Sequence, residues 1–545
     1  MIPKPSQTTG IQKMASHAGL KRQAGLLGLL FAGVGGMIGS GWLFGPLETA
    51  LQAGPLSIWS WAIGGVIVLL LALVFAELAT LIPLSGALVH MSHVSHGARV
   101  GFIWSWVLIL AYVAIAPIET MAIVTYADAY IPGLTDAKTG VLTAKGMIVA
   151  AALLGVMVAL NFLMIRTVLG VNTWATWWKL FVPLATVVVL VTYSWHPANF
   201  SVPAPESGFE GIFTAIATGG VFFSLFGFRQ AIDLAGESDN PGRHLPIAII
   251  GTVLIGTLIY VALQWAFITA IPPDMLAKGG WAGLHLQGLV GPLASLAAIA
   301  GAGWWATVLY ADAVVSPGAC GFVFTTTTSR VVMASGETGT LPAFFARVNS
   351  KGVPWAALIA TYLIGLVFFF PFPSWQKMVG YISSITVLSY GIGPILLLRL
   401  RKALPDANRP FRLWGASLIA PLAFISANWI ILWAGAQTVT FIFQLIAVIV
   451  LGQAFYHFVI CRRALAVYGW QGAAWLVPYF GGIWGISQLS AQALGGDGTL
   501  SFVATMVVSM VFSLLIMALA LKTAHSDAQI RISFAALLRD NPTPN

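Results

Sequence analysis

The sequence predicts an all-α polytopic membrane protein with about fourteen transmembrane helices. Hydrophobic residues make up 58% of the 545-residue chain and charged residues only 8%, whereas soluble domains carry about 25% charged residues. The apolar residues are gathered into runs of about 20, the length that a helix needs to cross a bilayer. Two of these runs, at corresponding places in two halves of the chain, are interrupted by glycines. This pattern predicts a transporter of two inverted five-helix repeats, with helices 1 and 6 broken.

Fourteen stretches are apolar and close to the length that a membrane crossing requires. Glycines interrupt the thirteenth, which is the weakest of them. The stretches are residues 24–46, 57–82, 101–129, 144–165, 171–195, 211–236, 245–271, 290–325, 355–371, 376–399, 414–435, 437–460, 471–490 and 498–522.

The distribution of Lys and Arg predicts that both termini are cytoplasmic. With the N-terminus inside, twenty of the 26 basic residues fall in inner segments and four in outer segments, while Lys179 and Arg229 lie within spans. Cytoplasmic loops are enriched in Lys and Arg, so this orientation is favoured. We expect a cytoplasmic segment over 1–23, a transporter core over 24–400 with repeats 24–195 and 211–400, additional C-terminal helices over 401–522 and a cytoplasmic tail over 523–545.

Composition also argues against other classes of protein. The formal charge is +9, but the basic residues lie in loops between apolar runs, so we expect no nucleic-acid partner. Cys320 and Cys461 fall in or at the ends of apolar runs, which predicts buried thiols rather than a disulfide framework or a metal site. The run after residue 23 is too long for a signal peptide and is expected to stay as the first span.

The first break is predicted by the stretch from Gly33 to Gly41, which holds five glycines in nine residues. Each glycine costs about 1 kcal/mol of helix propensity relative to alanine, and non-helical backbone at membrane depth survives only where protein buries it or it lines a cavity. The sixth apolar run is interrupted in the same way, so that Gly39 and Gly227 occupy comparable places in the two halves. Close packing of neighbouring helices on small residues is the alternative interpretation of the glycines.

A pair of helix breaks near the midplane offers partners for both charges of a zwitterion. The N–H groups at one half-helix N-terminus attract an anion, and the C=O groups at the C-terminus of the other half attract a cation. A small α-amino acid is therefore the expected class of ligand.

Five motifs, in order along the chain, resemble those of one family of transporters. They are Gly36-Met37-Ile38-Gly39-Ser40-Gly41, Phe75-Ala76-Glu77-Leu78 with Pro83-Leu84-Ser85-Gly86, Gly227-Phe228 with Ala235-Gly236-Glu237-Ser238, Thr328-Ser329-Arg330 with Leu341-Pro342-Ala343-Phe344-Phe345, and Asn408-Arg409-Pro410-Phe411-Arg412. These motifs are similar to those of the amino acid–polyamine–organocation superfamily. Within it, the chain most resembles the bacterial aspartate–proton symporter branch, through Gly39-Ser40-Gly41-Trp42-Leu43-Phe44, Asp312-Ala313-Val314-Val315-Ser316-Pro317-Gly318 and Pro371-Phe372-Pro373-Ser374-Trp375.

The resemblance implies a LeuT-like fold whose two broken helices hold the substrate. Backbone N–H groups of the first break would bind the substrate carboxylate, and carbonyls of the sixth helix would bind its ammonium. Phe223 resembles an aromatic gate over the pocket, although ordinary helix packing is an equal alternative in a chain with 32 phenylalanines. The expected substrate-binding residues are Gly36, Ile38, Gly39, Ser40, Gly41, Phe222, Phe223, Ser224, Leu225 and Gly227.

Lys179 lies deep within the fifth span, about eight residues from its start. An ammonium group held in an apolar environment can exchange its proton near neutral pH, and the resemblance implies that it stands where sodium-coupled relatives hold a cation. We therefore expect Lys179 to take part in proton coupling. The alternative is a lysine that extends to the interface and anchors the span.

The other charged residues within spans are candidates for a gate or for selectivity. Arg229 follows the break at Gly227 and could meet a side-chain carboxylate of the substrate, but pairing with Asp233 or Glu237 on the same segment is the favoured interpretation. Buried carboxylates are costly unless paired or protonated, and the sequence does not rank Glu77, Glu119 and Asp312. His90, His93 and His96 are expected to form a polar loop surface rather than a metal site.

The expected function is secondary active import of an amino acid, with an acidic, aspartate- or glutamate-like substrate favoured. The coupling ion is expected to be H⁺, with no cofactor and no metal, in a monomer or homodimer embedded in the inner membrane of a bacterium. The alternatives are an exchanger, a permease for neutral amino acids or amines, and a sensor that binds an amino acid without transporting it. An enzyme is not expected, because no nucleophile–base or metal cluster is visible in the spans.

Overall fold

The computed structural model describes residues 24–84, 86–136, 139–162, 165–277, 279–284, 291–349, 353–370, 372–455 and 471–540. The predicted all-α class is confirmed, since these residues form helices and two isolated β-bridges but no strand. The expected cytoplasmic segment 1–23 lies outside the described residues. So do Cys461, the end of the tail at 541–545, and several of the basic loop residues used to predict the orientation, namely Lys138, Lys278, Lys351, Arg462 and Arg463.

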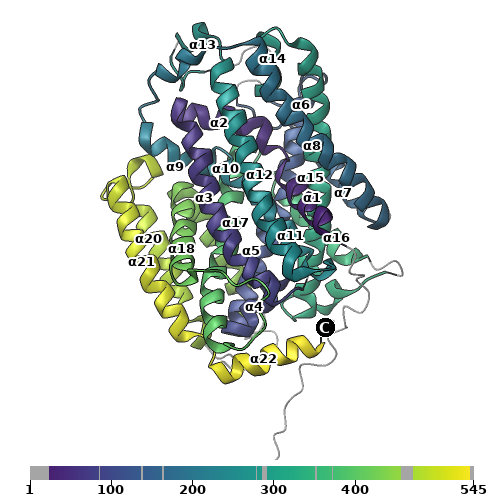
Figure 1. The fold of residues 1–545 in the computed structure, drawn as a ribbon, viewed down its shortest axis with the longest axis vertical. Helices are drawn as coiled ribbons and strands as arrows, with labels where there is room; N and C mark the ends of the chain where they lie inside the picture. Colours follow the sequence, from purple (N-terminus) through teal and green to yellow (C-terminus); the bar gives the residue numbers. More distant parts are fainter. Residues whose placement is uncertain are drawn as a thin grey trace, which may run out of the picture.

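The helices follow one another through the chain with short connections (Figure 1). The first half contains α1 (Leu26–Met37), α2 (Gly41–Ala53), α3 (Ser57–Leu81), α4 (Ala87–His96), α5 (Ala98–Val113), α6 (Ile115–Ala127), α7 (Ala144–Asn161) and α8 (Ile165–Tyr193). The second half contains α9 (Gly208–Thr218), α10 (Val221–Leu225), α11 (Arg229–Asp233), α12 (Pro241–Ala270), α13 (Pro273–Ala277), α14 (Pro292–Ile299), α15 (Gly303–Glu337), α16 (Trp355–Val367) and α17 (Trp375–Ala403). The last part contains α18 (Ala416–Trp433), α19 (Ala436–Phe455), α20 (Leu476–Leu489), α21 (Phe502–Thr523) and α22 (Asp527–Asp540).

Both predicted interruptions are present, but the bend of the sixth span lies at Gly219–Gly220 and not at Gly227, which lies in the short 3₁₀ turn Phe226–Phe228. The first helix stops at Met37 and resumes at Gly41, so that Ile38, Gly39 and Ser40 lie outside regular helix. In the sixth span, α9 and the segment Val221–Asp233 meet at an angle of 49°. Gly220 stands at this bend with a φ of 91°, a backbone conformation that favours glycine.

The glycines of the first break serve two different purposes. Gly33 and Gly36 lie inside α1, and a Cβ atom at Gly33 would come within 2.3 Å of Thr252 Oγ1 on α12. These two positions therefore permit close helix packing, as the alternative interpretation held. Only the segment Ile38–Ser40 is non-helical, which is shorter than the stretch that the sequence predicts as broken.

Ten helical segments of the described residues are long and apolar enough to cross a membrane, or eleven if the bent pair counts as one span. This number is below the fourteen predicted from apolar runs. The difference arises because three of the predicted stretches contain only short helices. Stretch 24–46 contains α1 with 12 residues and the start of α2, which has 13 residues. Stretch 355–371 contains α16 with 13 residues, and stretch 471–490 contains α20 with 14 residues.

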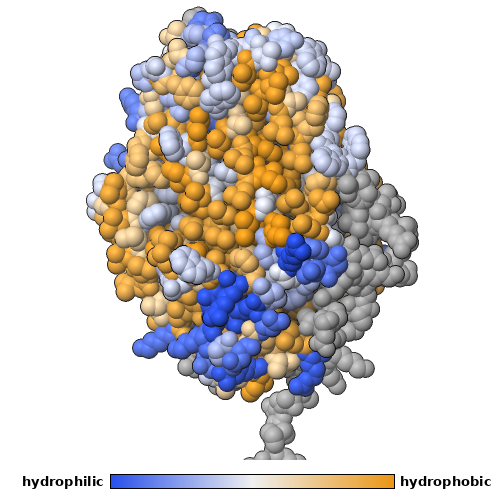
Figure 2. Space-filling model, viewed as in Figure 1, coloured by the Kyte–Doolittle hydropathy of each residue, from blue (hydrophilic) through white to orange (hydrophobic). Residues whose placement is uncertain are grey.

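The helices of the two halves interlock around the first break. Helix α1 packs against α12, α8 and α15, and α12 packs along α3. The last helices are peripheral, with α20 and α21 at the opposite edge of the bundle from α7 (Figure 1). Hydrophobic residues cover the middle of the visible face, and hydrophilic residues gather toward the end that carries α4 and α22 (Figure 2). An apolar exterior around an apolar interior is the arrangement that a lipid bilayer requires.

Candidate functional site

The two helix breaks lie directly against each other. A Cβ atom at Gly227 would lie 2.4 Å from the backbone nitrogen of Met37, and one at Gly41 would lie 2.0 Å from Ser224 Oγ. Because neither position leaves room for a side chain, glycine is required for this approach. The structure thus brings the expected substrate-binding residues of the first break together with those of the sixth span.

A carboxylate already occupies the N-terminal end of α2. The fully buried Glu119, on α6, accepts a hydrogen bond from the backbone N–H of Ser40, with a distance of 2.8 Å between N and Oε2. Its other oxygen lies so close to the backbone that a Cβ atom at Gly39 would be 2.3 Å away. The N–H group expected to bind a substrate carboxylate is therefore engaged by a carboxylate of the protein, at the end of the helix that favours negative charge.

The carbonyl groups that precede the break are also engaged by side chains from neighbouring helices. Lys179, on α8, donates from Nζ to the carbonyl oxygen of Gly35 at 2.6 Å and is 1% exposed. The Tyr260 hydroxyl, on α12, donates to the carbonyl oxygen of Met37 at 2.9 Å. The ammonium group of Lys179 thus lies inside the bundle at the break, a position that a lysine anchored at the membrane interface would not take.

Lys179 is surrounded by groups that can share or stabilise its charge. Glu119, Asp312 and the thiol of Cys320 all interact electrostatically with the ammonium. Asp312, on α15, accepts hydrogen bonds from Trp178 Nε1 at 2.8 Å and from the Ser316 hydroxyl at 2.6 Å. The structure therefore separates the three acids that the sequence left unranked, since two of them lie beside Lys179.

Glu77, the third acid, lies in a different network. It is fully buried near the end of α3 and accepts hydrogen bonds from Arg401 and from the backbone N–H of Leu413, and Arg409 Nε lies 3.2 Å from it. A buried carboxylate with two arginines and a backbone donor ties α3 to the segment after α17. This geometry indicates that Glu77 joins helices and segments of the fold, away from the two helix breaks.

Aromatic side chains cover the break on the side of α17. Trp375 donates from Nε1 to Ser40 Oγ at 2.9 Å and stacks on Phe44 with ring centroids 4.9 Å apart. Phe223 meets the edge of Trp375 at 6.0 Å and packs on Phe226 at 5.7 Å. Phe223 is therefore placed where a gate over the break would lie, and its ring also packs as an ordinary core residue would.

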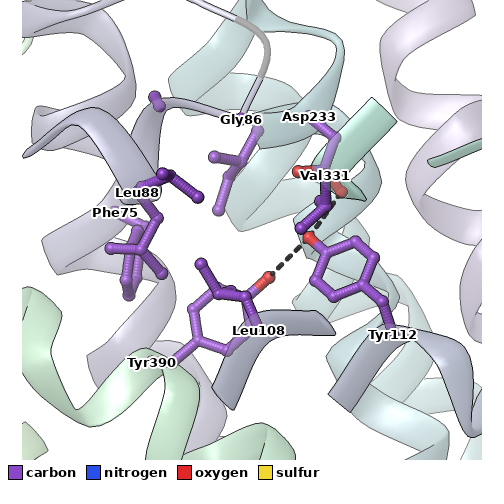
Figure 3. Close-up of a pocket in the computed structure, with 11 residues that line it drawn as sticks. Phe75, Gly86, Leu88, Leu108, Tyr112, Asp233, Val331 and Tyr390 are labelled. Atoms are coloured by element: carbon purple, nitrogen blue, oxygen red, sulfur yellow. Dashed lines mark hydrogen bonds between the residues drawn. The ribbon is translucent and has the colours of Figure 1, made fainter. Parts of the chain in front are cut away.

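The favoured pairing of Arg229 with an acid of its own segment is not found as a salt bridge. Asp233 accepts a hydrogen bond from the Tyr112 hydroxyl at 2.6 Å, as Figure 3 shows. Glu237 instead binds Arg330 at 2.6 Å. The guanidinium group lies over the ring of Tyr112, 3.5 Å from its centroid. An ion pair four or eight residues along a helix was expected from spacing alone, but the helix ends at Asp233 and the two acids face other partners.

The histidines after the second span do not form a polar loop surface. All three lie on α4, where His90 and His96 are buried and only His93 is exposed, as a surface position would be. His96 Nε2 lies 3.1 Å from the carbonyl oxygen of Ala520 on α21. Within the described ranges, no group of three His, Cys, Asp or Glu side chains could hold a metal ion.

Several residues at the site could not be identified from the sequence. Tyr260 lies in a long apolar run with no motif around it, and Cys320 was expected only as a buried apolar residue, although its thiol lies 3.5 Å from the Gly36 carbonyl oxygen. Trp375 belongs to a motif that the resemblance picked out, but no pattern linked it to Ser40.

The family of the chain follows from comparison with known proteins. Residues 25–465 match the model of the amino acid permease family. The chain belongs to that family. Among its relatives, this permease is 34% identical over 524 residues to the glutamate/serine transporter AimA of Bacillus subtilis (strain 168), covering 94% of this chain and 96% of the relative. It is 38% identical over 431 residues to the aspartate-proton symporter of the same organism, covering 79% and 82%.

Solved structures bear on the fold of this permease. A crystal structure of a mutant manganese transporter from Eremococcus coleocola aligns over 95% of this chain and 99% of its own, with a TM-score of 0.55 and 13% sequence identity. At this low identity, the likeness supports the shared helical transporter fold alone. The family assignment establishes an amino acid transporter embedded in a membrane, and not an enzyme.

Proposed function

We propose that this permease imports an acidic amino acid together with protons by alternating access. The names of two relatives, an aspartate-proton symporter and a glutamate/serine transporter, support an acidic substrate. The proposed orientation places the end with α4 and α22 in the cytoplasm of a bacterial cell, as the Lys and Arg distribution favours.

The hydrogen bond between Glu119 and the Ser40 N–H carries this proposal. An ionised Glu119 and a substrate carboxylate would compete for the same N–H group and would repel each other. Protonation of Glu119 weakens its charge-assisted bond and removes the repulsion. Substrate binding and proton binding therefore favour each other, which is the thermodynamic requirement for symport.

Lys179 provides the second half of the proposed coupling. Its ammonium group is held at Gly35 O and interacts with Glu119. When Glu119 becomes neutral, the ammonium loses a stabilising neighbour and can release its proton more easily. Neutral Glu119 cannot accept the proton that Lys179 releases, so in this proposal that proton passes to water on the side to which the site is open, and no bound sodium is required.

Contacts on both sides of the breaks are compatible with alternating access. Trp375 and Phe223 cover them on the side of α17. Toward the other end, the backbone N–H of Ala24 donates to Glu237 O at 2.9 Å, and Arg330 binds the side chain of Glu237. Opening one set of contacts while the other stays closed would expose the site to one side at a time.

Uptake by purified permease in sealed vesicles tests the proposal. Vesicles that contain no substrate should accumulate labelled aspartate when the external solution is more acidic, and the interior should acidify with uptake. Uptake only when the vesicles are preloaded with amino acid would identify an exchanger. Binding of aspartate without any uptake would identify a sensor, and either result would overturn the proposal.

A further inference from the structure

Arg229 carries a buried positive charge that forms no salt bridge among the described residues. Its side chain is fully buried, and Nε, Nη1 and Nη2 have no partner with hydrogen-bond geometry in that part of the chain. The nearest acid on its own helix, Asp233, is instead bound by Tyr112 (Figure 3). The Tyr390 hydroxyl also interacts with the guanidinium, but it is a neutral group. A guanidinium group has five N–H donors in a planar fork that fits a carboxylate.

Aromatic rings hold this guanidinium group in place. It lies 3.5 Å from the ring centroid of Tyr112 and 4.7 Å from those of Phe226 and Phe324. Such contacts offset only part of the cost of burying a charge that has no hydrogen-bonded counter-ion. The rings leave the edge donors unsatisfied, because a cation–π contact uses only the face of the guanidinium plane. Asp233 interacts electrostatically with the guanidinium group but forms no salt bridge with it, so the N–H donors of Arg229 still lack a hydrogen-bonded anion.

The start of α11, where Arg229 lies, adjoins the first break. The next residue, Gln230, is also fully buried, and its amide nitrogen and oxygen have no partner among the described residues. A Cβ atom at Gly36 would lie 2.7 Å from Gln230 Cγ. Arg229 also interacts electrostatically with Cys320, whose thiol reaches Gly36 O. The guanidinium thus belongs to a segment that packs directly against α1, beside the expected amino acid site.

We propose that Arg229 forms a subsite for the side-chain carboxylate of the substrate. The inference rests on the proposed function, since it requires an amino acid bound at the two breaks. The α-carboxylate takes the Ser40 N–H that Glu119 releases, and the second carboxylate of an aspartate-like substrate pairs with the guanidinium. The bound substrate then supplies the ion pair that Asp233 and Glu237 do not.

Binding of an isosteric pair of amino acids to the purified permease tests the subsite. Aspartate and asparagine have side chains of the same shape, but only aspartate carries the side-chain carboxylate that Arg229 is proposed to bind. The wild-type protein should bind aspartate more tightly. In Arg229→Gln the ratio of the aspartate to the asparagine affinity should fall about 10- to 100-fold, the loss expected for a hydrogen bond to a charged group. Arg229→Lys, which keeps the charge but not the fork, should lie between the two.

Asp233→Asn is the matched control on the same helix. It removes the acid that interacts electrostatically with Arg229 and its bond to Tyr112, so the ratio of the aspartate to the asparagine affinity should not fall as it does in Arg229→Gln. Thermal unfolding in detergent verifies that each variant is folded. If Arg229→Gln is not folded, the aspartate-to-asparagine affinity ratio of Arg229→Lys tests the subsite in its place.

Two outcomes would overturn the subsite. One is an aspartate-to-asparagine ratio that stays unchanged in both Arg229 variants, and the other is wild-type protein that binds asparagine as tightly as aspartate. Both would leave the proposed transport of an amino acid standing. Failure of the wild-type protein to bind any amino acid would instead remove the proposed function itself.

Discussion

In the proposed mechanism, single side chains at the first break determine how substrate binding responds to pH. Glu119 accepts a hydrogen bond from the Ser40 N–H and interacts with Lys179, so the proposal requires it to leave this N–H before a substrate carboxylate binds there. Most of the polar groups at this break come from other helices: Glu119 from α6, Lys179 from α8 and Tyr260 from α12. Their roles are therefore separable by substitution.

Glu119→Gln should make aspartate binding independent of pH. In the wild-type protein, aspartate binding should weaken as the pH rises, by up to tenfold per pH unit where one proton is taken up with the substrate. A glutamine can still occupy the space but cannot titrate, so the slope should vanish. Isothermal titration of aspartate binding at several pH values measures this slope.

Asp128→Asn is the control for this experiment. Asp128 follows the same helix but binds the loop at Leu134 and Thr135, away from the break. It should therefore keep the wild-type slope. A glutamine variant at position 119 with an unchanged slope would remove Glu119 from the coupling.

At the residue scale, the sequence identified which side chains are unusual but not what they touch. Lys179, Glu119 and Arg229 stand out because charge is rare within apolar runs. The contact between Glu119 and Ser40 joins residues 79 positions apart, and that between Trp375 and Ser40 joins residues 335 apart. No local pattern specifies such contacts, since they depend on how the helices pack.

At the scale of elements, the two broken helices work as one unit because they touch at glycines. A methyl group at Gly227 would collide with the backbone of Met37, which cannot rotate away as a side chain can. Gly227→Ala should therefore push the two breaks apart. Overpacking of this kind costs about 1–3 kcal/mol, enough to reduce the affinity for aspartate about tenfold or more.

Gly318→Ala is the matched control, because its nearest neighbour would be Ile123 Cδ1 at 3.9 Å. Binding and vesicle uptake measured for both variants should show a loss only for Gly227→Ala. Equal behaviour of the two variants would show that contact between the breaks does not determine binding.

The C-terminal helix α22 is docked by contacts that acid should weaken. Asp527 pairs with Arg399 at 2.6 Å, and the backbone N–H of His525 donates to Ser95 O at 3.0 Å. Burial lowers the pKa of His96 to about 4, and burial together with the nearby Arg399 lowers the pKa of His525. The docked state binds fewer protons than the undocked state, in which both pKa values approach about 6.5. Docking is therefore fully stable above about pH 6.5 and weakens as the pH falls toward 4.

Hydrogen exchange of the α22 backbone measures this effect. After correction for the intrinsic rate, protection should decrease between about pH 7 and pH 5. His96→Gln, which cannot titrate, should show a smaller decrease. Protection that stays constant across this range would contradict the assigned role of the histidines.

The sequence predicted that the first and sixth spans are both interrupted, because glycines fall within otherwise helical apolar stretches. It placed the second break at Gly227, whereas the bend lies at Gly219–Gly220. It overestimated the length of the first break, because Gly33 and Gly36 remain in helix α1, where they allow close packing against Thr252 and Gln230. The burial of His90 and His96 on α4 was missed because three polar side chains between spans resemble a surface loop. His96 contacts Ala520 of α21, which is 424 residues away in the sequence.

At the scale of the whole molecule, the two helix breaks, the charged side chains of Glu119 and Lys179, and the aromatic side chains of Trp375 and Phe223 form one connected site. Two contacting half-helices hold polar groups at the centre of an apolar bundle, and a Glu–Lys pair from two further helices engages them. Composition and run length were enough to predict this class of architecture, because lipid requires backbone polar groups to be satisfied within helices. The exchange of partners during transport depends on tertiary contacts that only the structure reveals.

We propose that Lys179 and Glu119 couple proton movement to substrate movement, and Lys179→Ala separates the two. Two assays are compared in the same vesicles: exchange of labelled for unlabelled aspartate at equal pH, and net uptake into empty vesicles driven by external acid. The variant should retain exchange, because the first break still binds substrate, while acid-driven net uptake should fall to the level of protein-free vesicles. Acid-driven uptake that persists at the wild-type rate in Lys179→Ala would show that Lys179 does not take part in proton coupling.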